Sequence, residues 1–278
     1  MPFLVIRGRY HVKGYAPDGD SIRFEPLNPS LLDDLAGPPA KLNARGHAQL
    51  RLEAIDTLET HFKAFHQPME FAKKATDHLM AQLGITGVEW NATGTKVVAA
   101  DDDKPGYILA REVESNRRPV AFAFAGAPPE ADGSDLFLTP ERLLLSANAE
   151  MLRSGLAYPT YYQGLFSDLR LALTELSIAA RADGKGLWPH DKTNAGFAVT
   201  GMSSITEDHV ILPKLFRRLA DYLEAGGPVA GFKEFVEAMR DEVLIISTAH
   251  TTHFDTLIEV IGNVVRLTEP PENLIFRG

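Results

Sequence analysis

Apolar and polar residues alternate through much of the first half of the chain, which predicts a region rich in β-strands. The pattern favours strands over residues 3–13 and 20–25, and Leu50, Leu52 and Ala54 then recur at every second position. Further strands are expected near residues 87–91, 96–99, 107–113 and 120–124. Residues 26–47 are rich in proline and glycine, so we expect a long loop there with one helical turn at residues 31–35.

Apolar positions at helical spacing predict three helices in the same part of the chain. The first helix is expected over residues 68–83, with Pro68 as its first residue and an apolar side that includes Phe71 and Leu79. The other two are expected over residues 140–154 and 166–182, where glycines follow the last periodic positions.

The pattern changes after residue 188. Residues 189–202 are expected to form a linker, followed by amphipathic helices over residues 211–223 and 232–239. A buried strand is expected at residues 243–246, and a hairpin at 258–267 turns at Gly262 and Asn263. Residues 203–278 therefore read as a small α+β accessory domain of unknown role.

The composition is that of an ordinary globular chain. Its 278 residues, 45% hydrophobic and 23% charged, are enough for one large domain or two smaller ones, and we expect two. The chain has no cysteine, which excludes disulfides and thiolate metal sites. The apolar run at residues 1–6 is too short for a secretory signal, and no run reaches transmembrane length. A cytoplasmic protein without a membrane partner is the expectation.

Ionisable residues gather where the Leu50 strand ends. Arg51, Asp56 and Glu59 surround this strand end, where a rigid element holds side chains and a loop leaves them open to a ligand; a solvated turn would give the same pattern. Upstream, Asp20 belongs to an Asp-Gly turn that leads into a strand able to pair with the Leu50 strand, so Asp20 and Asp56 are expected to face the same point. Two carboxylates beside the backbone carbonyl of Thr57 favour Ca²⁺ over Zn²⁺.

With these residues the sequence resembles the staphylococcal-nuclease (thermonuclease) family. The resemblance rests on ordered segments between residues 3 and 190: Asp18–Ser21, Arg51–Thr60, Gly106–Ala110, Asn148–Ala157 and Gly186–Trp188. It implies an OB-fold over residues 1–190, which is a five-stranded β-barrel with three helices whose open face receives nucleotides and oligonucleotides. The overall fold class expected is thus α+β, with the accessory domain after the barrel.

The resemblance also implies an activity and a role for each site residue. Asp20, Asp56 and the Thr57 carbonyl would hold Ca²⁺. Glu59 would be the general base that activates water, and Arg51 would bind the phosphate of DNA or RNA. Tyr161 falls where the family often has a tyrosine that lines the nucleotide pocket.

Two positions depart from the family pattern. Leu58 stands where a proline is usual, which is expected to loosen the turn without removing any chemistry. Tyr107 stands where the second phosphate-binding arginine belongs, so it becomes an expected substrate contact and the reaction loses a cation. In arginine-finger enzymes such a loss is worth about 10³ to 10⁵ in rate. Arg111 lies about 13 Å further along the strand, too far for simple replacement. Loop residues Lys104, Arg117 and Arg118 remain candidates.

Charge favours a second interpretation. The formal net charge is −9, whereas tight non-specific binding of long nucleic acid usually shows as a basic face. Together with Tyr107, this keeps open a catalytically impaired nuclease-fold module that binds nucleic acid, nucleotide or protein. A third possibility makes the C-terminal domain the functional part and the barrel its scaffold.

Three further features each have two interpretations. The loop at residues 26–47 is either a lid that limits substrate size or tolerated surface. The triple aspartate at 101–103 reads as a solvated turn, because three consecutive side chains do not easily converge on one ion. His250, His253 and Asp255 offer a transition-metal ligand set, but a polar loop is favoured because no third histidine fixes the geometry.

Overall fold

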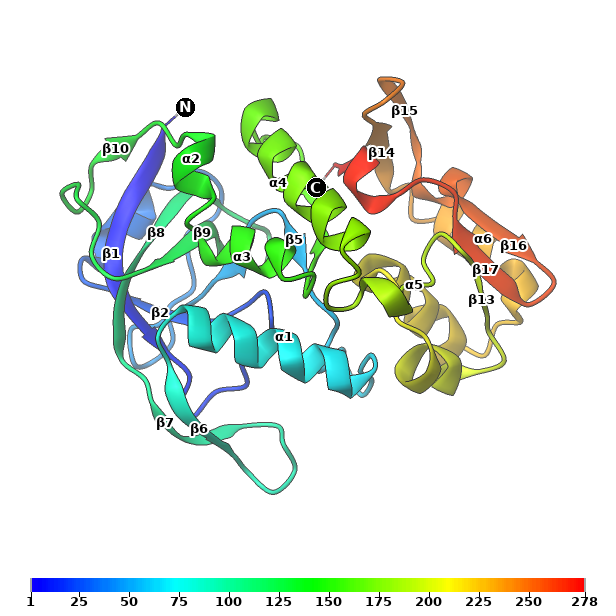
Figure 1. Cartoon of the computed structure of the whole chain (residues 1–278), viewed down its shortest axis with the longest axis horizontal. Coiled ribbons are helices and arrows are strands. Elements are labelled where there is room, and N and C mark those ends of the chain that lie inside the picture. Colours follow the sequence, from blue (N-terminus) through cyan, green and yellow to red (C-terminus); the bar gives the residue numbers. More distant parts are fainter. Residues whose placement is uncertain (1, 278) are drawn as a thin grey trace. The chain divides into compact units, whose positions relative to one another are not determined.

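The computed structural model describes residues 2–277 and shows a mixed α/β protein with two compact units (Figure 1). The first unit contains residues 1–53 and 76–151, and the second contains residues 54–75 and 152–278. The boundary expected between residues 190 and 203 therefore lies inside the second unit. Within residues 2–277, no helix is long and apolar enough to cross a membrane.

A barrel-like sheet forms the first unit. Its strands are β1 Phe3–His11, β2 Arg23–Pro26, β3 Ala48–Gln49, β4 Arg51–Leu52, β8 Lys104–Val113, β9 Pro119–Ala125 and β10 Asp135–Leu136. The order is β3-β2-β1-β8-β9-β4, with β10 paired to β1 and β4 parallel to β9. Strands β6 Thr86–Trp90 and β7 Val97–Asp101 form a separate hairpin.

Leu50 nearly closes this sheet into a barrel. Strand β3 pairs with β2 at one edge, and β4, one residue later, pairs with β9 at the other edge. The amide of Leu50 donates to the carbonyl of Ile22 at 2.9 Å, and that of Leu52 donates to Asp20 at 2.8 Å. The alternation expected here is confirmed as far as Leu52, because Leu50 and Leu52 are fully buried and Arg51 is half-buried, but Glu53 is buried as well. At Ala54 the backbone takes a left-handed conformation (φ 68°), which ends the strand.

The helices expected before residue 190 are present, one of them in two pieces. Helix α1 covers Met69–Gln82 and α4 covers Ser167–Ala182, close to the expected ranges. The helix expected over 140–154 is divided into α2 Pro140–Leu143 and α3 Ala147–Arg153. The break has a local cause: the Ser146 hydroxyl accepts a hydrogen bond from the Ala149 amide and starts a new helix.

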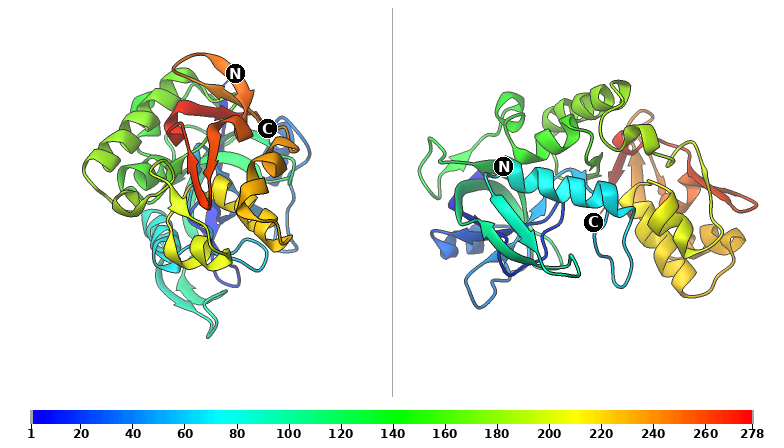
Figure 2. Two further views of the ribbon diagram at one scale, coloured as in Figure 1. Left: turned by 90° about the vertical axis from the view of Figure 1, so that its right-hand side faces the viewer. Right: turned by 60° about the horizontal axis from the view of Figure 1, so that its bottom comes forward.

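The second unit combines short strands with helices α5 Pro213–Glu224 and α6 Phe232–Glu237 (Figure 2). Its strands are β5 Ile55–Asp56, β11 Tyr158–Pro159, β12 Tyr161–Tyr162, β13 Phe197–Ala198, β14 Glu242–Ile245, β15 His250–His253, β16 Ile258–Ile261, β17 Val264–Leu267 and β18 Leu274–Phe276. They form three small sheets: β11-β5, β12-β18-β14-β15 and β13-β17-β16.

One hydrophobic cluster joins the early and late residues of this unit. It contains Leu58 and Tyr158 together with Phe216, Val243 and Phe276 from the C-terminal region. The linker expected at residues 189–202 is wrong, because Phe197 and Val199 are buried in this cluster and β13 pairs with β17. The expected hairpin at Gly262 is confirmed, since β16 and β17 are antiparallel and Gly262 has a φ of 63°.

Candidate functional site

Asp56 lies on a short strand inside the second unit. Strand β5 pairs with β11, so that Asp56 lies opposite Tyr158, and the Thr160 amide donates to the carbonyl of Ala54 at 3.0 Å. Only 4% of the Asp56 side chain is exposed. A carboxylate as buried as this one needs a partner, because burial without one penalises its charged form.

The turn that carries Glu59 is held by Gln67. The Glu59 amide donates to the Gln67 side-chain oxygen at 3.2 Å, and the Gln67 amide donates to the Glu59 carbonyl at 2.9 Å. Gln67 is fully buried and its side-chain nitrogen donates to the carbonyl of Ile211. Leu58, which stands where a proline was expected, is buried in the hydrophobic cluster. Packing and these hydrogen bonds fix the turn in place of a rigid proline.

Arg217 from α5 binds both acids at once. Its guanidinium donates to the two carboxylate oxygens of Asp56 at 3.1 and 2.8 Å, and to Glu59 at 2.5 Å. The Asp56 contact is bidentate, the geometry that makes arginine–carboxylate pairs strong and directional. Burial raises the pKa of Glu59 above its ordinary value, while Arg217 opposes that rise. The pKa of Arg217 lies well above its ordinary value because both carboxylates stabilise its charge. The three side chains form what we call the Asp56–Glu59–Arg217 cluster.

Asp20 and Arg51 belong to the first unit. Both are half-buried, and Arg51 is the first residue of β4. The backbone at Asp20 bonds to Leu52, next to Arg51, so the pairing expected between these two segments is confirmed. Asp56, Thr57 and Glu59 belong to the second unit, where Asp56 and Glu59 share Arg217 as a hydrogen-bond partner.

The donor atoms near Asp56 can be compared with the needs of Ca²⁺. Thr57 is 2% exposed, and its buried hydroxyl oxygen has no hydrogen-bond partner within the described residues. Carboxylate and neutral oxygens of this kind suit a hard cation. Both Asp56 oxygens, however, accept hydrogen bonds from Arg217. The residues fit Ca²⁺ only after Arg217 leaves Asp56.

The two tyrosines expected to contact substrate are both buried. Tyr161 is fully buried, and its hydroxyl bonds to the Thr174 hydroxyl at 2.8 Å. Tyr107 is 7% exposed and its ring stacks on Phe124 at a centroid distance of 4.7 Å. Arg142 donates to the Tyr107 hydroxyl at 3.2 Å. Substrate contact by either tyrosine stays a prediction.

The cations considered as replacements for the missing arginine all have other partners. Lys104 pairs with Asp101, Arg118 pairs with Glu114, and Arg117 donates to the carbonyl of Pro39. Arg111 lies over the Phe3 ring at 4.6 Å. The arginine that does meet the acids, Arg217, was missed. It lies 158 residues from Glu59, and a chain separation that long leaves no local motif in the sequence.

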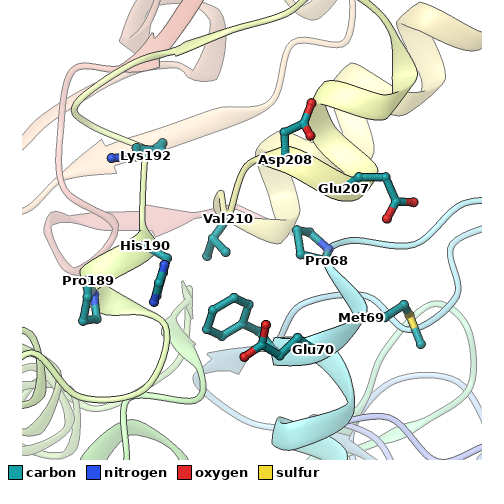
Figure 3. Close-up of a pocket in the computed structure, with 10 residues that line it drawn as sticks. Pro68, Met69, Glu70, Pro189, His190, Lys192, Glu207, Asp208 and Val210 are labelled. Atoms are coloured by element: carbon teal, nitrogen blue, oxygen red, sulfur yellow. The ribbon is translucent and has the colours of Figure 1, made fainter.

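A pocket in the second unit does not include these acids. It encloses about 410 Å³ and is lined by residues from the start of α1 and from two later segments. Figure 3 shows Glu207 and Asp208 on one side of the pocket and His190 and Lys192 on the other. Its walls carry both signs of charge, and none of the residues expected to act in catalysis lines it.

The remaining metal expectations have clear outcomes. The triple aspartate makes separate contacts: Asp101 pairs with Lys104, Asp102 accepts from the amides of Val12 and Lys13, and Asp103 pairs with Arg9. The polar loop expected at residues 250–253 is wrong, since they form β15 against β14. Among residues 2–277, no cluster of three metal-binding side chains includes His250, His253 or Asp255.

Comparison of the chain with protein-family models and with curated protein sequences finds no match in either set.

Proposed function

We propose that the chain is a Ca²⁺-dependent phosphodiesterase of the staphylococcal-nuclease type that hydrolyses DNA or RNA. The observation that carries the proposal is the Asp56–Glu59–Arg217 cluster. It holds a metal-binding type of carboxylate and a half-buried base, both hydrogen-bonded to the same cation. Phosphoryl transfer draws on these three kinds of group.

The strand order supports the finer fold proposal, an OB-fold in the first unit. Strands β1, β2 and β3 follow one another in pairing order, β8 pairs with β1, and β9 lies between β8 and the parallel β4. With β3 and β4 counted as one strand interrupted at Leu50, this is a five-stranded order. A five-stranded barrel is typical of OB-folds, which bind oligonucleotides on an open face. Within this proposal residues 203–278 are an α+β accessory region whose helix α5 supplies Arg217.

The proposed roles follow the sequence expectation with one addition. Following the resemblance, Asp20, Asp56 and the Thr57 carbonyl would hold Ca²⁺, and the bound ion would polarise the phosphate and neutralise its charge. Arg51 binds the phosphate. Arg217 takes the part of the arginine that Tyr107 replaces: in the described arrangement it neutralises Asp56 and Glu59, and on substrate binding it transfers to the phosphate oxygens.

Glu59 acts on water. Its carboxylate accepts a proton from the water whose oxygen attacks phosphorus, a new P–O bond forms, and the P–O bond to the leaving oxygen breaks. The leaving oxygen takes up a proton, so that one phosphodiester and one water give a phosphomonoester and an alcohol. When Arg217 leaves Glu59, the carboxylate regains the lone pair that this step needs.

Cleavage of fluorescent single-stranded DNA and RNA tests the proposal. The wild-type chain is assayed with Ca²⁺ and with chelator, beside Glu59→Gln and Arg217→Gln. Arg218→Gln is the matched control, because Arg218 lies next along α5 and pairs with Asp241. We expect Ca²⁺-dependent cleavage that falls about 10² to 10⁴-fold in Glu59→Gln. It should fall about 10³-fold in Arg217→Gln and stay near wild type in Arg218→Gln. Cleavage that survives in Glu59→Gln would contradict the assigned base.

The arrangement of Arg217 also favours a second candidate, a module that has lost catalysis and binds nucleic acid, nucleotide or protein. In that case the bidentate pair with Asp56 is permanent and keeps Ca²⁺ out. Calorimetry separates the two candidates. If wild type neither cuts nor binds Ca²⁺ while Arg217→Gln gains Ca²⁺ binding, the pair is a permanent block and the second candidate holds.

A further inference from the structure

Two histidines and a glutamate converge on the surface of the barrel, far along the chain from one another. His11 ends β1, Glu25 lies in β2, and His47 immediately precedes β3. In the antiparallel register Arg9 lies opposite Glu25 and His11 lies opposite Arg23. Residues opposite each other, or diagonal by two positions, share one face of a sheet and come within side-chain reach. The pairing of β1, β2 and β3 thus brings the three side chains together.

Their ligand atoms are close enough for one ion. The Nε2 atom of His11 lies 2.9 Å from Oε2 of Glu25, and Nε2 of His47 lies 4.0 Å from the same oxygen. All three ligand atoms lie within 4.8 Å of one another. Ligands of a tetrahedral Zn²⁺ at about 2.0 to 2.2 Å from the metal are about 3.4 Å apart. The observed separations lie on both sides of that value, so small side-chain rotations suffice.

The exposed fractions of the three side chains suit a metal ion that enters from solvent. The side chains of His11 and His47 are 14% and 8% exposed, while that of Glu25 is 43% exposed. The two imidazole rings stack with centroids 4.1 Å apart, which fixes their orientation. The Asp103 carboxylate lies 3.7 Å from the His11 Nε2 atom, through the same oxygen that Arg9 contacts.

Contacts behind His47 orient its ring as in a metal site. Its Nδ1 atom lies 3.1 Å from the Tyr15 hydroxyl, which also accepts from the Asn43 side chain at 2.9 Å. In the tautomer with its proton on Nδ1, His47 donates to Tyr15 and turns the Nε2 lone pair towards Glu25. Metal-binding histidines commonly donate their other ring N–H in this way. Burial lowers the pKa of His47, which favours the neutral, ligating form.

Among the described residues, the arginines near the Glu25 carboxylate contact other groups. Arg23 and Arg45 lie over the Tyr15 ring at 5.1 and 5.5 Å, and Arg9 pairs with Asp103. They weaken the local attraction for a cation but leave the Glu25 oxygen facing the histidines.

We propose that His11, Glu25 and His47 form a binding site for a divalent transition metal, with Zn²⁺ as the expected occupant. Two imidazoles and one carboxylate are a ligand set for Zn²⁺ and its first-row neighbours, whereas Ca²⁺ prefers oxygen alone. The fourth position is taken by water. The bound metal clips three strands together where the loop at residues 26–47 rejoins the barrel. The site shares no residue with the proposed Ca²⁺ site.

Titration of the tag-free, chelator-treated chain with Zn²⁺ tests the proposal, with Co²⁺ as a spectroscopic probe. We expect one Zn²⁺ per chain by calorimetry, a rise in Tm on binding, and visible Co²⁺ absorption bands of a tetrahedral site. Excess Ca²⁺ should not displace the metal.

Variants assign the ligands. His47→Ala and Glu25→Gln are each expected to weaken Zn²⁺ binding by about 100-fold or more, and Tyr15→Phe by about tenfold. His250→Ala, an exposed histidine in the second unit, should bind as wild type. Glu25→Gln serves if His47→Ala fails to fold, because Glu25 is the more exposed of the two side chains, at 43% against 8%. Absence of saturable binding in wild type, or equal affinity in Glu25→Gln, would overturn the proposal.

Discussion

Single side chains connect parts of each unit that local sequence does not relate. Asn148 is fully buried in the first unit and makes three hydrogen bonds. Its oxygen accepts from the Ala123 amide at 2.9 Å, and its nitrogen donates to the carbonyls of Glu53 and Ala121 at 2.9 and 3.1 Å. It thereby fixes the end of the strand that leads into the acidic turn. The sequence placed Asn148 in the family resemblance without giving a reason for it.

Replacing Asn148 should therefore destabilise the chain strongly. Asn148→Ala leaves one buried amide and two carbonyls with fewer partners, and we expect a loss of about 2 to 4 kcal/mol in the free energy of unfolding. Urea denaturation measures it. Asn116→Ala, at an exposed turn position, is the matched control and should change stability by less than about 0.5 kcal/mol. Equal midpoints for the two variants would show that the buried hydrogen bonds contribute little.

At the scale of elements, helix α5 carries three basic residues, of which Arg217 contacts one pair of acids and the other two share Asp241. Arg217 binds Asp56 and Glu59, and Arg218 binds Asp241. Lys214 has its amine 4.4 Å from the Phe276 ring centre and 3.7 Å from Asp241. The amphipathic pattern predicted the helix correctly, because apolar residues at 3.6-residue spacing must face a core. It did not predict the partners, because these come from strands and turns elsewhere in the chain.

Lys214 should make stability depend on pH. Burial lowers its pKa below the ordinary value of 10.5, so the unfolded chain binds this proton more tightly than the folded chain. Stability therefore rises with pH between the lowered pKa of Lys214 in the folded chain and 10.5. Below that lowered pKa, Lys214 is charged in both states, and the full cost of burying its charge is present. We expect Lys214→Met to raise Tm at neutral pH, with the difference from wild type shrinking towards pH 10. Thermal melts of both proteins across this range measure it. A constant difference would mean that Lys214 does not titrate differently on folding.

Two glycines that lie far apart in the chain's secondary structure come into close backbone contact. Gly155 and Gly186 both have positive φ, at 69° and 55°, and the Leu187 amide donates to the Gly155 carbonyl at 2.9 Å. A side-chain carbon on Gly186 would lie 2.1 Å from that carbonyl oxygen. Only glycine allows the two backbones to approach so closely. The sequence predicted Gly155, and either Gly184 or Gly186, as helix stops, and the contact between Gly155 and Gly186 appears only in the folded chain.

At the scale of the whole chain, the C-terminal region is not an independent appendage of the segment before residue 190. Tyr158, Leu187 and Trp188 share one buried cluster with residues of α5, α6 and the last strands. Strand β12 pairs with β18, which places residues 161–162 in a sheet with the C-terminus. The division expected near residue 190 fails to appear because apolar residues on both sides of it pack together.

Ending the chain after residue 190 should therefore disrupt the second unit. Trp188 is 6% exposed in the full chain and would lose most of its cluster. We expect its fluorescence to shift to longer wavelength and the thermal transition to broaden, because the exposed apolar surface is no longer buried. Trp90→Phe in both chains isolates the signal of Trp188. Native-like emission from the shortened chain would show that residues 1–190 form a self-sufficient domain.

The sequence by itself determined the helices, the long strands and the hairpin at Gly262, because these depend on local periodicity and turn chemistry. It also placed Asp56 and Glu59 close to each other, because they lie only three positions apart in the chain. Only the tertiary structure decided that Arg217 pairs with Asp56 and Glu59. It also decided that the side chains of His11, Glu25 and His47 come together. These contacts join residues far apart in the chain, and they arise from strand register and core packing, which no local pattern encodes.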